Sequence, residues 1–177
     1  DRGRRLAEHE FKDLGEIYNP AWSPDGRRIA FSALKGGVLD LYLFDLESRQ
    51  LQQLTDDPFA DLDPEWTPDG KQIVWVTDRF SSNLETLAFG NYRLAIFDVP
   101  ASTPAGSRTA ESGAVLAQGR PRAYAGFDTG RNTNPEFTAD GTLYFIATPD
   151  GIPNVYRQGA TGSAEKFTNV VSGVSGI

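Results

Sequence analysis

The chain has 177 residues, with 24 acidic and 17 basic side chains, a formal net charge of −7, one histidine and no cysteine. Apolar residues make up 39% of it, which is typical of a globular protein, and no apolar stretch approaches the roughly 20 residues that a membrane-spanning helix needs. The absence of cysteine excludes disulfides, thiolate zinc sites and cysteine nucleophiles, and the acidic balance argues against nucleic acid as a partner.

An eight-residue motif occurs three times, at residues 19–26, 63–70 and 134–141. Each copy begins with Asn or Asp before proline, continues through an aromatic residue and ends in Asp-Gly. The Asp-Gly pair predicts a hairpin turn in which the glycine adopts the left-handed conformation. The motif is therefore the organising repeat of the chain.

Short strands are predicted around each copy of the motif. Apolar second strands follow the turn, at residues 28–32, 72–77 and 142–147. Third strands are predicted at residues 39–45, 92–98 and 154–157, and more polar fourth strands at residues 51–55, 114–118 and 165–168. The second and third strands are apolar on both faces, so each must be covered on both sides. Four short antiparallel strands per repeat of about 40–45 residues indicate an all-β fold made of β-propeller blades.

The repeats divide the chain into three blades, at residues 16–56, 57–119 and 120–169, the second with insertions and the third with a long lead-in. Residues 1–15 are interpreted as the tail of a preceding unit, with residues 11–15 as its outer strand, and residues 170–177 as the start of a next blade. Because a closed propeller normally needs at least four blades, we expect an incomplete propeller and a fragment of a longer protein. Two uncovered apolar blade faces predict self-association.

The pattern Asn/Asp-Pro-x-Trp-Ser/Thr-Pro-Asp-Gly, followed by Asp-Leu-Tyr-Leu-Phe-Asp and Gln-Leu-Thr, resembles the WD40-like repeat of TolB-type propellers. It is also similar to blades of prolyl-oligopeptidase-family propellers and of the tricorn protease. The resemblance covers about residues 16–169 and is specific for the fold rather than for the function. The third copy departs from the pattern, with Phe137 in place of tryptophan and Ala139 in place of proline.

The resemblance implies a non-catalytic protein-interaction scaffold of a bacterial envelope or exported protein, periplasmic or extracellular, because TolB-type propellers dock lipoproteins and other envelope proteins. The alternative is the substrate-gating propeller of a serine peptidase whose hydrolase domain lies outside this chain. A Gly-x-Ser-x-Gly segment downstream in the gene would favour the peptidase. A third class, a metal-dependent lyase on a related propeller, needs a histidine cluster, whereas His9 is the only histidine here.

The chemistry-bearing residues predict no catalysis by this chain itself and no cofactor. A Ser-His-Asp triad would have to use His9, and residues 173–176 lack the spacing of a nucleophile elbow. We interpret His9 as a surface or inter-strand residue. Aromatic residues at two repeated positions are expected to form the core between blades: Trp22, Trp66 and Phe137 at the first, and Phe31, Trp75 and Phe145 at the second.

Extra loop length occurs within the second repeat, at residues 79–91 and 100–113, and before the third copy of the motif, at residues 119–133. The last of these stretches carries several residues that are favoured at interfaces: Arg120, Arg122, Tyr124 and Arg131. They are candidates for partner contact, and inter-blade packing or neutral surface is the alternative interpretation.

An acidic stretch precedes and enters the second copy of the motif, at residues 56–69. Asp61 and Asp63 are weak candidates for a calcium site, because calcium prefers oxygen ligands. The alternative is that Asp63 stabilises a turn, since Asn19 and Asn134 occupy the same repeat position. Loops before the innermost strands gather at the mouth of a propeller channel, so Asn19, Asp61, Asp63 and Asn134 are also candidates for contact with a protein partner.

Overall fold

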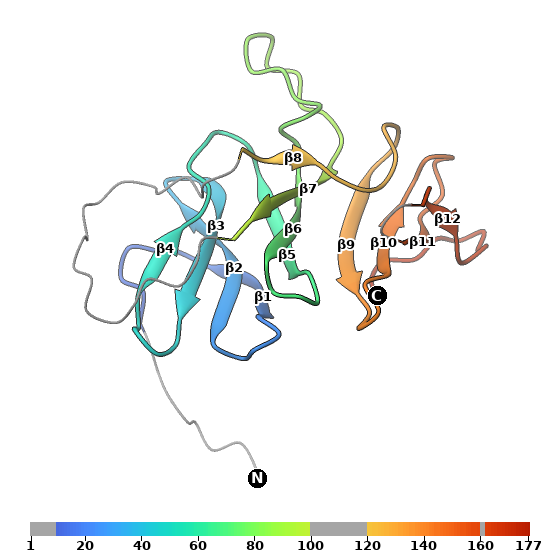
Figure 1. The fold of residues 1–177 in the computed structure, drawn as a ribbon. Helices are drawn as coiled ribbons and strands as arrows, with labels where there is room; N and C mark the ends of the chain where they lie inside the picture. Colours follow the sequence, from blue (N-terminus) through green and yellow to red (C-terminus); the bar gives the residue numbers. More distant parts are fainter. Residues whose placement is uncertain (1–9, 100–119, 160–161) are drawn as a thin grey trace.

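The computed structural model describes residues 10–99, 120–159 and 162–177, which form three separate four-stranded sheets (Figure 1). The first sheet consists of β1 (Ile17–Trp22), β2 (Arg28–Lys35), β3 (Val38–Asp45) and β4 (Leu51–Gln53). The second consists of β5 (Asp61–Trp66), β6 (Gln72–Thr77), β7 (Arg93–Asp98) and β8 (Arg122–Ala123). The third consists of β9 (Asn132–Phe137), β10 (Leu143–Ala147), β11 (Asn154–Gln158) and β12 (Glu165–Lys166).

Within each sheet the strands follow one another in sequence order and every neighbouring pair is antiparallel. This is the four-stranded meander of a propeller blade, so the all-β prediction is confirmed. The blades form an open array of three sheets, consistent with an incomplete propeller (Figure 1). The described ranges contain no helix of the length and apolarity that crossing a membrane requires.

The hairpin between the first two strands of each blade has the predicted turn. In blade 2 the Gly70 N–H donates to the carbonyl oxygen of Thr67 at 2.8 Å, and the Thr67 hydroxyl donates to the Asp69 carboxylate at 2.7 Å. The φ angle of Gly70 is 68°, and the φ angles of Gly26 and Gly141 are 69° and 85°. The left-handed glycines that the motif predicts are confirmed.

The Asn or Asp before proline lies inside the innermost strand of each blade. Asn19, Asp63 and Asn134 have φ angles of 48°, 47° and 50°, and the pairing with the second strand shifts register at each of them. These features define a β-bulge. Asn and Asp tolerate the left-handed conformation better than other non-glycine residues, which explains their presence there. The expected turn role of Asp63 is therefore wrong, because the residue bends a strand.

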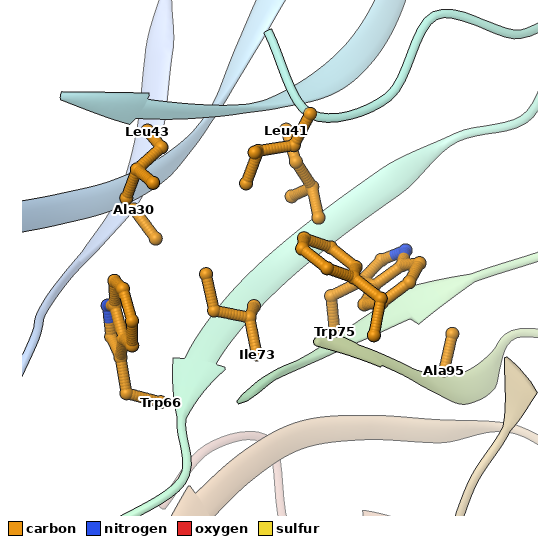
Figure 2. Close-up of a cluster of buried hydrophobic side chains, with 9 residues drawn as sticks. Ala30, Leu41, Leu43, Trp66, Ile73, Trp75 and Ala95 are labelled. Carbon is orange, nitrogen blue, oxygen red and sulfur yellow. The ribbon is translucent and has the colours of Figure 1, made fainter. Parts of the chain in front are cut away.

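Apolar side chains fill the space between neighbouring sheets. Figure 2 shows the cluster between blades 1 and 2, where Trp66, Ile73 and Trp75 lie opposite Ala30 and Leu41. The other faces of β6 and β7 pack against the third sheet through a second cluster, comprising Val74, Val76, Leu94, Ile96, Leu143, Phe145, Ala147 and Tyr156. Because blade 2 has a core on both sides, its central strands are apolar on both faces, as predicted.

The repeated aromatic residues differ in burial. Trp66 is 3% exposed, and Trp75 and Phe145 are also buried between blades, as predicted. Phe31 is buried too, but on the outward face of blade 1 rather than between blades. Trp22 stands at the same repeat position as Trp66, yet it is 59% exposed. The core prediction is wrong for Trp22, because no blade among the described residues covers that face of the first sheet.

The segment before the first blade packs on that same outward face. The Phe11 ring lies 5.5 Å from the Phe31 ring and meets the Phe44 ring edge-on at 5.1 Å, and Leu14 joins this cluster. Residues 11–15 form no strand. The prediction that they form the outer strand of a preceding unit is therefore wrong; their apolar side chains cover part of a blade face that no other blade of the described residues covers.

The outer strand of blade 2 lies later in the chain than expected. Its position is set by pairing with β7, in which Ala123 lies opposite Ala95 and Arg122 opposite Ile96. The predicted boundary between residues 119 and 120 thus falls before the end of blade 2, because hydrogen bonding assigns Arg122 to the second sheet. The fourth strand predicted at residues 114–118 lies outside the described residues.

Candidate functional site

Two cavities lie where the connections between strands β2 and β3, β6 and β7, and β10 and β11 meet the segments that lead into the innermost strands. We call the larger one, of about 560 Å³, the loop pocket. The smaller one, of about 310 Å³, is the inner pocket, and its walls include Asp63 and Asn134. Both cavities are lined by Tyr92 and Arg131, so they share one wall.

Arg131 lies just before β9 in a segment with several hydrogen bonds. Its backbone N–H donates to the Thr148 hydroxyl at 2.8 Å, and the Arg93 guanidinium donates to the carbonyl oxygen of Gly130 at 2.6 Å. The Arg131 guanidinium carbon lies 5.3 Å from the centroid of the Tyr92 ring, a cation–π arrangement. A positive charge is thus held at the wall between the two cavities.

The structure brings three of the sequence candidates together around the inner pocket: Asp63, Arg131 and Asn134. Burial raises the pKa of the Asp63 carboxyl, and a hydrogen bond from the backbone N–H of Asn134 opposes that rise. This bond joins the bulges of β5 and β9, so the Asp63 carboxylate connects the innermost strands of two blades.

Asp61 does not belong to this surface. Its carboxylate is completely buried and accepts hydrogen bonds from the Trp75 indole at 2.8 Å and from Arg79 at 2.8 Å and 3.0 Å. Arg79 also pairs with Asp57 at 2.9 Å. Burial raises the pKa of the Asp61 carboxyl, which the Arg79 charge opposes. The expectation that Asp61 is a calcium ligand or a partner contact is wrong, because its oxygens are occupied and inaccessible.

Sequence reasoning missed Arg79 as the partner of Asp61. The signal was available, because Asp61 begins β5 and pairs with Thr77 at the end of β6, so the residues after Thr77 reach the same end of the sheet. Within the described ranges, no group of three or more His, Cys, Asp or Glu side chains could hold a metal ion.

Sequence reasoning also missed a pair of glutamates on the innermost strands of blades 2 and 3, Glu65 and Glu136. Burial, followed by the nearby Glu136 carboxylate, raises the pKa of Glu65 to about 7, against hydrogen bonds from the backbone N–H groups of Phe137 and Trp66. Burial also raises the pKa of Glu136. Each of these two glutamates directly precedes the aromatic residue of its copy of the motif. Comparing the motif copies in the sequence could therefore have identified the pair.

The remaining candidates lie away from the two cavities. Arg122 is on β8 at the outer edge of blade 2, where its guanidinium is 3.8 Å from the Asp98 carboxylate, and both side chains are exposed. Arg120 and Tyr124 flank that strand and are also exposed. Asn19 is exposed on β1 of the first blade and lines neither cavity. The arginines of residues 119–133 thus lie in two places: Arg120 and Arg122 at the outer edge of blade 2, and Arg131 at the wall that the two cavities share.

Comparison with known proteins agrees with this geometry. Residues 3–83 match the family described as TolB beta propeller domain. The Tol-Pal system protein TolB of Anaeromyxobacter dehalogenans (strain 2CP-1 / ATCC BAA-258) is 40% identical over 65 residues, which are 35% of this chain and 15% of that protein. The uncharacterized peptidase YuxL of Bacillus subtilis (strain 168) is 42% identical over 57 residues, 32% of this chain and 9% of that protein.

Among solved structures, TolB from Acinetobacter baumannii superposes with a TM-score of 0.63 at 24% sequence identity, over 90% of this chain and 34% of that one. The chain therefore spans well under half the length of these relatives. The match to the TolB family, the repeated motif and the three antiparallel meanders agree with one another. The chain is made of TolB-type β-propeller repeats.

Proposed function

We propose that this chain is a non-catalytic protein-interaction scaffold whose contact surface is the mouth formed by the loop pocket and the inner pocket. The observation that carries the proposal is the shared wall of Tyr92 and Arg131, which places a guanidinium over an aromatic ring between two cavities. Arginine and tyrosine side chains are typical anchors of protein interfaces. The likeness to TolB, whose name places that relative in the Tol-Pal system, supports a protein partner.

We extend the proposal to location: a bacterial envelope or exported protein, periplasmic or extracellular. Its support is again the likeness to TolB in sequence and fold. Fractionation of cells that express the full-length gene with an epitope tag tests it. Recovery in the cytoplasmic fraction alone would contradict the proposed location.

The partner is sought by cross-linking and pull-down from a bacterial envelope fraction, and its purified form is then titrated against variants of this chain. Arg131→Glu is expected to weaken binding at least about tenfold, mainly by slowing association, because it reverses the charge at the shared wall. Asp63→Asn keeps a residue type that tolerates the bulge, as Asn19 and Asn134 show, and tests the inner pocket alone.

Gln52→Lys on the outer strand β4 is the matched control and is expected to leave binding unchanged. Binding that is insensitive to Arg131→Glu but weakened by Gln52→Lys would contradict the mouth as the contact surface. The circular dichroism spectrum and melting temperature of each variant verify that the fold is intact.

A second candidate is the substrate-gating propeller of a serine peptidase, which the local identity to the peptidase YuxL supports. The full-length gene sequence distinguishes the two proposed functions, because a Gly-x-Ser-x-Gly segment outside this chain would favour the peptidase. Turnover of peptide or ester substrates by this chain itself, abolished by a single substitution in it, would contradict both candidates.

A further inference from the structure

The connection between β6 and β7 differs from its counterpart in blade 1. There β2 and β3 are joined by a tight turn at Gly36 and Gly37, whereas blade 2 inserts the loop of residues 79–91. In Figure 1 this insertion loop projects beyond the ends of the sheets, above β6 and β7. Its length alone exceeds what a hairpin requires.

Hydrogen bonds hold the base of the insertion loop to the blade. The Ser82 hydroxyl donates to the Asp78 carboxylate at 2.7 Å, and the other oxygen of that carboxylate accepts from the backbone N–H of Ala60 at 3.1 Å. The Gly90 N–H donates to the Ser82 hydroxyl oxygen at 2.9 Å. A Cβ atom on Gly90 would lie 2.3 Å from the Ser81 backbone, so only glycine fits this closure. The loop is therefore a built element of the mouth.

The tip of the loop places apolar side chains in solvent. Leu87 is 72% exposed and Phe89 is 77% exposed, and Leu84 is also exposed. Leu87 has a φ angle of 53°, which is unfavourable for a residue of its type. Reciprocal backbone hydrogen bonds between Asn83 and Ala88, at 2.8 Å and 3.0 Å, hold the tip in this form. Exposed apolar area and backbone strain in one short segment point to a surface that is buried on binding.

Phe89 also lines the loop pocket, whose lining includes both apolar and charged side chains. Apolar lining residues come from the β2–β3 hairpin and the segment before β5, with Leu34, Val38 and Pro58. Tyr92 and Arg131 line the same cavity. The volume of about 560 Å³ lies in the range of cavities that bind ligands or partner side chains.

The charge of Arg131 has no carboxylate counter-ion among the described residues. Among the described residues, no carboxylate lies within ion-pairing distance of Arg131. The Asp78 carboxylate at the same pocket is buried and already accepts hydrogen bonds from Ala60 and Ser82. In a chain with a net charge of −7, a guanidinium that no described carboxylate pairs with, in a cavity that also has apolar lining residues, is complementary to an apolar ligand that carries a carboxylate.

We infer that the loop pocket binds an extended internal segment of a partner protein, in which a bulky apolar side chain enters the cavity beside Phe89 and a neighbouring Asp or Glu pairs with Arg131. The segment is internal because the loop pocket and the inner pocket meet at Tyr92 and Arg131, so a chain can continue past the guanidinium. The inference rests on the proposed function and names the chemistry of the partner at that mouth.

The test uses two displayed peptide libraries, one of 12-residue peptides flanked on both sides by carrier sequence and one with free carboxyl termini. Selection on this chain is expected to enrich internal peptides that place Phe, Leu or Trp next to Asp or Glu. A selected peptide, capped at both ends and labelled, is then titrated by fluorescence anisotropy. Arg131→Gln and Phe89→Ser are each expected to weaken binding at least about tenfold, and Arg131→Lys to restore part of the loss.

Leu46→Ser is the matched control, because Leu46 is an exposed apolar residue outside both cavities. No enrichment, enrichment of basic peptides, or preference for free carboxyl termini would overturn the inference. A natural partner whose binding depends on Arg131 but not on Phe89 would overturn it while leaving the proposed function in place. A partner insensitive to both variants would overturn the proposed function itself.

Discussion

The indole N–H of Trp66 donates a hydrogen bond to the backbone carbonyl oxygen of Ala21 at 3.2 Å, across the boundary between blades 1 and 2. The Arg28 guanidinium carbon of blade 1 lies 4.8 Å from the centroid of the same ring. One side chain of the motif thus joins two blades by apolar packing, a hydrogen bond and a cation–π contact. Trp22 occupies the same position in blade 1, and no blade formed by the described residues lies opposite it.

This difference predicts unequal effects of the same substitution. Trp66→Phe removes the bond to Ala21 and part of the packed volume, and is expected to lower the free energy of unfolding by about 1–3 kcal/mol. Trp22→Phe is expected to change it by less than about 0.5 kcal/mol, because the side chain is largely exposed. Chemical denaturation of both variants measures the difference. Equal losses would show that Trp66 does not connect the blades energetically.

The turn glycines provide a second prediction. Gly70→Val is expected to lower the free energy of unfolding by about 1–3 kcal/mol, because a β-branched residue is strained in the left-handed region. A Cβ atom on Gly70 would contact Pro24 at an ordinary 3.6 Å, so the loss reports backbone strain rather than a clash.

Two comparisons complete this measurement. Gly159→Val is the control, since a Cβ atom there meets nothing within 4 Å and its φ angle is not left-handed. Shortening residues 100–113, which lie outside the described residues, is expected to lower the melting temperature less than Gly70→Val does, since loop closure depends weakly on length. A larger loss from the deletion would indicate that this segment packs into the fold.

The buried carboxyl of Asp40 predicts a pH dependence. Burial raises its pKa from an ordinary 3.8 to about 6, although a hydrogen bond from the Thr55 hydroxyl opposes the rise. Between these values the folded state binds more protons than the unfolded state, so the free energy of unfolding falls as pH rises through the window. The loss from this group is on the order of 1–3 kcal/mol.

Asp40→Asn is expected to reduce the decrease in the free energy of unfolding between pH 3.8 and about 6. Thermal unfolding of both proteins below and above this pH range measures the difference. The chain contains a precedent, because the Thr168 hydroxyl of blade 3 donates to the Asn154 amide oxygen at 3.0 Å in the same arrangement. The free energy of unfolding of this variant should still depend on pH to some extent, because the pKa of Glu65 is also raised. An unchanged slope would show that Asp40 does not titrate in this range.

The outward face of blade 1 predicts self-association. It exposes Trp22, and Phe11 and Leu14 are the described residues that pack over part of it. Light scattering is expected to show a dimer or a larger species whose fraction rises with concentration. Trp22→Arg should shift it toward the monomer, while Leu46→Arg, on the β3–β4 turn, should not. A wild-type chain that is monomeric at all concentrations would contradict this prediction.

Local chemistry made much of the fold predictable. The Asp-Gly turns, the short strands and their apolar faces depend on neighbouring residues, and the repeated motif showed them three times. The outer strand of blade 2 was misplaced because it consists of two residues, Arg122 and Ala123, whose assignment depends on pairing with β7. The bulge at Asp63 was missed because proline after Asn or Asp is equally typical of a turn.

The amino-acid sequence by itself determined the class of fold, the blade repeat and the left-handed glycines, because these follow from periodicity and turn chemistry. Only the tertiary structure decided which polar residues are accessible. Asp61 is buried because β5 pairs with β6 and brings Arg79 to it, whereas Arg131 reaches the mouth because blades 2 and 3 meet at Tyr92. Burial and accessibility depend on which elements become neighbours, and residues far apart in the chain decide that.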